Sequence, residues 1–263
     1  MASFLLVGCV VGLALGLTGG GGSILAIPLL LYWVHLPFGE AKMISLAAVG
    51  LTSLVGAILQ PRLGVVRWRA GAILGLGGVL AAPVGILWGH ALDPQWNLGL
   101  FSALMVIVAL RMWRGGMDLP LGRWACPRNE QGLPIPTLSC AGKIMAAGSL
   151  AGVLAGMFGV GGGFLVVPAL QIVTGMGMER VASTSLVAIS VISGAAFLFG
   201  LGAGGAVDPA SLGIFCAGGG AGITLGIWGK KLCSPLILSR LFASLSFLAA
   251  SYIFFQVFLA GKQ

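Results

Sequence analysis

Apolar residues along the chain form long, almost uninterrupted stretches separated by short polar or glycine-rich segments. A transmembrane helix needs roughly 20 residues, and six stretches have about this length: 41–59, 70–88, 96–113, 181–201, 209–228 and 235–258. Two others, 3–34 and 140–174, are too long for one crossing and too short for two. Each carries glycines near its middle, at 19–22 and at 159–163, which predicts broken or re-entrant helices.

The composition supports an all-α polytopic membrane protein. Hydrophobic residues make up 58% of the 263 residues, charged residues only 8%, and the mean hydropathy is +1.08. A soluble domain carries about 25% charged residues, and its helices need a polar face that these stretches lack. The net charge of +8 comes from basic residues between the apolar stretches. This placement indicates membrane loops rather than a nucleic-acid surface, and predicts a multi-pass protein of the bacterial inner membrane with the lipid bilayer as its partner.

The cysteines give no sign of a disulfide or metal site. Their number is odd and their spacing shows no pairs, so we expect neither a disulfide framework nor zinc, and no cofactor. The five are Cys9, Cys126, Cys140, Cys216 and Cys233.

The two halves of the chain are related by a constant offset of 140 residue numbers. Gly16, Gly19, Pro28, Ser45, Ser53 and Trp88 match Gly156, Gly159, Pro168, Ser185, Ser193 and Trp228. Matching glycine, proline and tryptophan positions without a gap indicate an internal duplication. The sequence therefore predicts a first transmembrane repeat at 1–113, a linker at 114–139 and a second repeat at 140–263, each repeat with one broken helix followed by three transmembrane helices.

The basic residues also predict how the repeats are oriented. Loop 60–69 carries three arginines whereas its partner, loop 200–209, carries no basic residue. The next pair is reversed, because loop 90–95 has none and loop 229–240 has three. Lys and Arg favour cytoplasmic loops, so equivalent loops lie on opposite sides and the repeats are expected to be inverted, with a cytoplasmic linker.

The two glycine motifs are the strongest candidates for a binding site. Irregular backbone at membrane depth is tolerated only inside protein or along a cavity, and a half-helix that begins there points its N–H groups and positive dipole end at that cavity. Paired broken helices are also typical of a transporter's substrate site. The expected lining residues are Gly19, Gly20, Gly21, Gly22, Ser23, Gly159, Gly161, Gly162 and Gly163. The alternative is that the glycines only allow helices to pack closely.

The duplicated Gly-x-x-Gly-x-Gly-Gly…Pro pattern, followed by Ile-Ser-Leu at 44–46 and Ser-Thr-Ser-Leu at 183–186, resembles the sulfite exporter TauE/SafE family. The resemblance implies a membrane permease for sulfite, sulfonates or related organosulfur anions. The first copy departs from the pattern, with Lys42-Met43-Ile44 where the second has Ala182-Ser183-Thr184. The first half therefore lacks the counterparts of the Ser183 and Thr184 hydroxyls.

Hydroxyl groups on two of the stretches are further candidates for contacts to an oxyanion. They are Ser45, Thr52, Ser53, Thr184, Ser185 and Ser193, with Gln171 as an additional polar group. Each has an alternative role, because such side chains also bond their own helix or a neighbouring one. No Asp, Glu, Lys or Arg lies clearly in the middle of a stretch, so a buried carboxylate relay is not visible.

These features together predict a secondary transporter that moves a small sulfur-containing anion, such as sulfite or an organosulfonate, by alternating access. A passive anion channel or a membrane subunit of a larger complex remains the alternative. An intramembrane enzyme is not expected, because it would need convergent catalytic groups within the spans, and both histidines lie at the ends of stretches.

Overall fold

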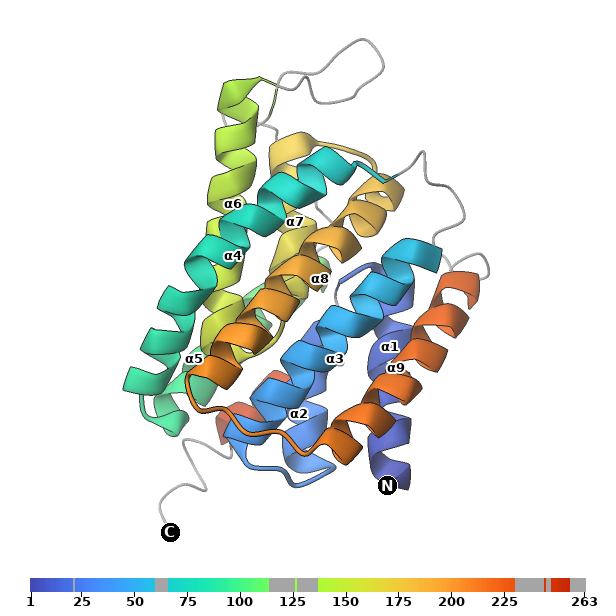
Figure 1. Ribbon diagram of the computed structural model, residues 1–263, viewed down its shortest axis with the longest axis vertical. Helices are drawn as coiled ribbons and strands as arrows, with labels where there is room; N and C mark the ends of the chain where they lie inside the picture. Colours follow the sequence, from blue (N-terminus) through green and yellow to red (C-terminus); the bar gives the residue numbers. More distant parts are fainter. Residues whose placement is uncertain are drawn as a thin grey trace.

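The computed structural model describes residues 1–20, 22–59, 66–113, 126, 137–229, 244 and 247–255, and in these residues all regular structure is helical (Figure 1). The helices are α1 (Ala2–Thr18), α2 (Ser23–Tyr32), α3 (Phe38–Leu59), α4 (Trp68–Ala91), α5 (Pro94–Trp113), α6 (Leu138–Phe158), α7 (Gly163–Thr174), α8 (Met178–Gly202) and α9 (Pro209–Gly229). Five of them, α3, α4, α6, α8 and α9, are long and apolar enough to cross a bilayer. Large apolar side chains such as Leu80, Leu198 and Trp228 are exposed on the outside, as expected of a surface that faces lipid.

Both long apolar stretches are interrupted at their glycines. Helix α1 ends at Thr18 because Gly19 takes a left-handed conformation with φ of 76°, and α6 ends at Phe158 because Gly159 has the same φ of 76°. Only glycine adopts this conformation without a steric penalty. A second helix begins a few residues later in each case, so the predicted breaks are present.

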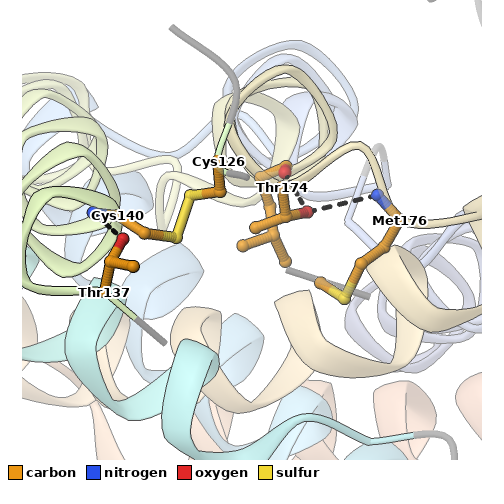
Figure 2. Close-up of a disulfide and its surroundings, with 6 residues drawn as sticks. Cys126, Thr137, Cys140, Thr174 and Met176 are labelled. Atoms are coloured by element: carbon orange, nitrogen blue, oxygen red, sulfur yellow. Dashed lines mark hydrogen bonds between the residues drawn. A yellow bond between two sulfur atoms is a disulfide. The ribbon is translucent and has the colours of Figure 1, made fainter. Parts of the chain in front are cut away.

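The second broken segment returns to the end of the molecule where it started. The backbone N–H of Cys126 donates to the Val173 carbonyl oxygen at 2.8 Å, and Cys126 forms a disulfide with Cys140 in the first turn of α6 (Figure 2). Since Val173 lies at the end of α7, that end must be close to the start of α6. Helices α6 and α7 therefore form a re-entrant hairpin.

The disulfide corrects the expectation drawn from the cysteines. The two residues are 14 apart in sequence, and this spacing resembles no disulfide or metal motif. Their proximity depends on Cys126 folding back onto the α6/α7 hairpin, which is a tertiary contact that cysteine spacing does not reveal.

Glycines allow two pairs of helices to pack at close range. In the first pair, Gly12 of α1 lies against the backbone of Gly219 in α9; in the second, Gly152 of α6 lies against Gly78 of α4. Both pairs involve helices that are equivalent under the 140-residue offset, with partners exchanged between the halves. Many glycines outside the breaks thus serve the close packing typical of membrane helices.

The order of the contacts gives the direction of each helix. Gly8 contacts Phe215 and Gly16 contacts Ile223, so α1 and α9 are parallel. Along α3 and α8 the order is reversed, because Met43 lies near Gly200 and Gly50 near Gly194.

Figure 1 shows the same directions, with α1, α3 and α9 running upward and α4, α6 and α8 running downward. Equivalent helices of the two halves therefore run in opposite directions.

Candidate functional site

The two breaks meet in the interior of the protein. A Cβ atom on Gly20 would lie 2.5 Å from the carbonyl oxygen of Gly163, and one on Gly163 would lie 2.8 Å from both the Gly20 carbonyl oxygen and the Ser23 Oγ. The N-terminal ends of α2 and α7 are thus in contact, and only glycine fits at either position. Gly21, predicted as part of this lining, lies outside the described residues.

The helix ends at this contact carry no acidic side chain in their first turns. No side chain of these turns therefore neutralises the positive ends of the two helix dipoles. Ser23 is fully buried, and its hydroxyl donates to the Gly20 carbonyl oxygen at 2.9 Å. At the second break, Gly161 and Gly162 have φ of 69° and 66°, which orients the turn before α7.

Serines of α8 hold both breaks in place. The Ser185 hydroxyl donates to the Gly19 carbonyl oxygen at 2.6 Å, and the Ser193 hydroxyl donates to the Gly161 carbonyl oxygen at 3.0 Å. Both serines are fully buried. One helix of the second half therefore binds the breaks of both halves, and its hydroxyls are occupied by backbone.

The equivalent serines of α3 are left without partners. Ser45 and Ser53 are fully buried, and within the described part of the chain neither Oγ has a hydrogen-bond partner. A buried polar group without a partner costs about 1–3 kcal/mol. These two hydroxyls therefore keep unused hydrogen-bonding capacity in the described part of the chain, and the sequence departs from the repeat close to Ser45.

Three of the predicted residues make other hydrogen bonds or lie farther along their helix. The Thr52 hydroxyl donates to its own helix at Ala48, at 2.6 Å. The Thr184 Oγ1 accepts from the backbone N–H of Arg67, at 3.1 Å, just before α4 begins. Gln171 lies eight residues after the start of α7, about 12 Å along the helix axis, and its Oε1 is buried without a partner among the described residues.

Lys42, which the sequence did not single out as a site residue, packs against the second break. It is only 8% exposed, and a Cβ on Gly159 would lie 2.8 Å from the Lys42 Cβ, so its side chain packs directly on the second break. The equivalent contact in the other half is between Ala182 and Gly19. The sequence signal at this position is the mismatch between Lys42 and Ala182 across the two halves.

A pocket of about 420 Å³ lies at the other end of α2, away from the breaks. It is lined by Pro28, Leu29, Tyr32, Trp33, His35, Ala249 and Tyr252. Its lining is largely apolar, although Tyr32, Trp33, His35 and Tyr252 carry groups that can donate hydrogen bonds. No group of three or more His, Cys, Asp or Glu in the described residues could hold a metal ion.

Comparisons with known proteins agree with this architecture. The sulfite exporter TauE/SafE family matches residues 4–253. A protein of Xylella fastidiosa named "Probable membrane transporter protein" is 40% identical over 187 residues, which cover 69% of this chain and 67% of the relative. A Bacillus subtilis protein named "Probable membrane transporter protein YdhB" is 30% identical over 188 residues, covering 70% and 72%. No solved structure matches the chain.

The match extends over nearly the whole chain and includes both breaks, and the relatives are bacterial membrane transporters by name. With its apolar spans, the protein is a multi-pass protein of the bacterial inner membrane. The chain belongs to the sulfite exporter TauE/SafE family of membrane transporters.

Proposed function

We propose that the protein is a secondary transporter that moves a small sulfur-containing anion, such as sulfite or an organosulfonate, across the inner membrane. The observation that carries this proposal is the contact between the two breaks at Gly20 and Gly163. Two positive helix ends converge there without an acidic residue in either first turn. A helix N-terminus binds anions through its unpaired N–H groups and its dipole.

We propose that the hydroxyls of Ser45 and Ser53, which have no partner among the described residues, supply further donors for the anion. An oxyanion accepts hydrogen bonds through several oxygens, so it would satisfy groups that have no partner in the described part of the chain. The family match favours sulfite among such anions. The site residues are then the two breaks, with Ser45 and Ser53 from α3, while Ser185 and Ser193 hold the breaks in shape.

The mechanism that this arrangement favours is alternating access. The two halves are proposed to be inverted repeats, a reading supported by the opposite directions of α3 and α8 and by the arginines of loop 60–69. In such transporters one repeat rocks against the other around a site near the bilayer midplane. The linker at 114–139 joins the repeats on the cytoplasmic side.

Transport by purified protein in liposomes tests this function. We expect uptake of sulfite or of a small sulfonate, saturable with concentration and competed by unlabelled anion. Uptake of a neutral analogue of the same size, such as a sulfone, should not exceed that of empty liposomes. Absence of sulfur-anion flux in either direction, with and without an imposed proton gradient, would contradict the proposal.

A further inference from the structure

Lys42 is a buried cation at a membrane-embedded helix break. It lies in the second turn of α3 and is 8% exposed. Its stem crosses Gly159, and its Nζ approaches Gly89 in the last turn of α4, where an added Cβ would lie 2.9 Å from it. No ion pair to Lys42 occurs within the described residues.

A buried charge without a counter-ion is expensive. Removing one ion from water costs several kcal/mol even after the protein relaxes, and ionisable residues inside membrane proteins mark substrate or ion pathways. The C-terminal ends of α6 and α4 lie next to Lys42, and the negative ends of their dipoles offset part of this cost. The part of the desolvation cost that the helix dipoles do not offset indicates that the Lys42 charge serves a function rather than stability.

Packing does not explain the lysine. At the equivalent position of the other half, Ala182 packs on Gly19, where an added Cβ would lie 2.6 Å from the Ala182 Cα. The corresponding distance from Gly159 to the Lys42 Cα is 2.9 Å. Alanine therefore makes the same contact in the second half. The contact does not require the long stem and the positive charge of Lys42, which only the first half has.

Ser45 provides a second, independent observation at the same place. It follows Lys42 by three residues, so both side chains lie on the same face of α3. Its hydroxyl is fully buried and has no partner in the described residues. The equivalent Ser185 is satisfied by Gly19. An unpaired donor and an unpaired cation thus lie one turn apart beside the second break.

We propose that Lys42 and Ser45 contact the transported anion at the second break, one oxygen on the Lys42 ammonium and another on the Ser45 hydroxyl. This proposal rests on the proposed function and refines it. The site is unequal at its two ends: the end at Gly159 binds the anion with a charge, and the end at Gly19 binds it without one. The ligand class is a small oxyanion with at least two free oxygens.

Substitution of Lys42 separates charge from packing. Lys42→Met keeps the stem and removes the ammonium, and Lys42→Ala introduces the residue that the other half carries. We expect both variants to fold, with a melting temperature in detergent without anion no lower than that of the wild type. In liposomes the KM for sulfite should rise by about tenfold or more, the effect of losing one hydrogen bond to a charged group. Lys42→Arg should retain more activity than Lys42→Met.

Arg69→Met provides the control, because Arg69 is exposed at the start of α4 and its loss changes the net charge by the same amount. Its KM should remain that of the wild type. An unchanged KM in folded Lys42→Met, or an equal rise in Arg69→Met, would overturn the role of Lys42 while leaving the proposed function intact.

A readout that does not depend on sulfite transport separates the two proposals. The melting temperature is measured with sulfate, phosphate, sulfite and methanesulfonate added in turn. Suppose that the wild type transports no sulfur anion but is stabilised by another oxyanion, and that Lys42→Met loses this stabilisation. The proposed transport of sulfur anions is then wrong, whereas the anion site at Lys42 is supported. If Lys42→Met keeps the full response, the site is wrong.

Discussion

The Ser185 hydroxyl donates to the Gly19 carbonyl oxygen at 2.6 Å, so a helix of the second half holds the broken helix of the first. The equivalent serine of the first half, Ser45, has no such bond in the described structure. The two halves therefore share a sequence pattern but use the same hydroxyl differently.

This difference predicts opposite effects on stability. Ser185→Ala leaves the Gly19 carbonyl oxygen without its donor and should lower the free energy of unfolding by about 0.5–1.5 kcal/mol. Ser45→Ala removes a hydroxyl that has no partner among the described residues and should leave stability unchanged or slightly raised. Chemical unfolding of the purified variants in detergent measures both. Equal losses would show that Ser45 is also a structural donor.

The KM for sulfite should depend on the α3 serines, even though their loss does not lower stability. Ser45→Ala and Ser53→Ala remove donors proposed for the anion, so the KM for sulfite should rise several-fold while the folded fraction stays constant. Thr52→Ser serves as the control, because that hydroxyl bonds the Ala48 carbonyl oxygen of its own helix and the substitution retains it. An unchanged KM in both serine variants would show that the α3 hydroxyls do not bind the anion.

The helix breaks could be predicted from sequence, because the glycines at 19–22 and 159–163 interrupt apolar stretches that are too long for one crossing. Glycines alone would not have been enough, since Gly218–Gly220 lie inside the continuous helix α9. The partners of the hydroxyls could not be predicted. Thr184 accepts from Arg67, 117 residues earlier in the chain, and Ser185 reaches across 166 residues to Gly19. Such contacts depend on how the two halves fit together.

Lys42 and the cysteines were missed for a related reason. By position, Lys42 lies near the start of an apolar stretch, where a lysine usually extends to the interface. Its burial follows from Gly159, which comes from the other half. Likewise the Cys126–Cys140 pairing follows from the position of Cys126 against the end of α7, where its N–H donates to the Val173 carbonyl oxygen.

The disulfide provides a test of membrane orientation. Five basic residues in and around the linker predict a cytoplasmic location; they are Arg111, Arg114, Arg123, Arg128 and Lys143. The cytoplasm keeps thiols reduced, so we expect Cys126 and Cys140 to be free thiols in intact cells and to form their disulfide after extraction without reductant. Acid quenching followed by alkylation and mass spectrometry measures this. A disulfide already formed in cells would place the linker on the periplasmic side and reverse the orientation.

Asp208 predicts a pH dependence outside the membrane spans. Its carboxylate lies before α9 and accepts from the Ser211 hydroxyl at 2.6 Å and from the Ser211 N–H at 2.9 Å. The side-chain hydrogen bond from Ser211, followed by the backbone bond, lowers the pKa of Asp208 below its usual value of 3.8. A lowered pKa in the folded state means that the contribution to stability is complete above the unfolded pKa, near pH 4, and is lost as pH falls through the folded value.

Asp208→Asn should therefore reduce the loss of stability on acidification from pH 5 to pH 3, and Ser211→Ala should reduce it as well. Thermal unfolding at a series of pH values measures the change. If both variants lose stability on acidification as steeply as the wild type, the acid sensitivity arises elsewhere.

The contact between Gly20 and Gly163 carries the central claim, and binding to the purified protein tests it most directly. Gly163→Ala places a methyl group where the two breaks meet, whereas Gly194→Ala places one in open space on the neighbouring α8. Calorimetric titration with sulfite should give saturable binding for the wild type and for Gly194→Ala, and none for folded Gly163→Ala. Binding to Gly163→Ala with the wild-type Kd would contradict the claim that the paired breaks form the anion site.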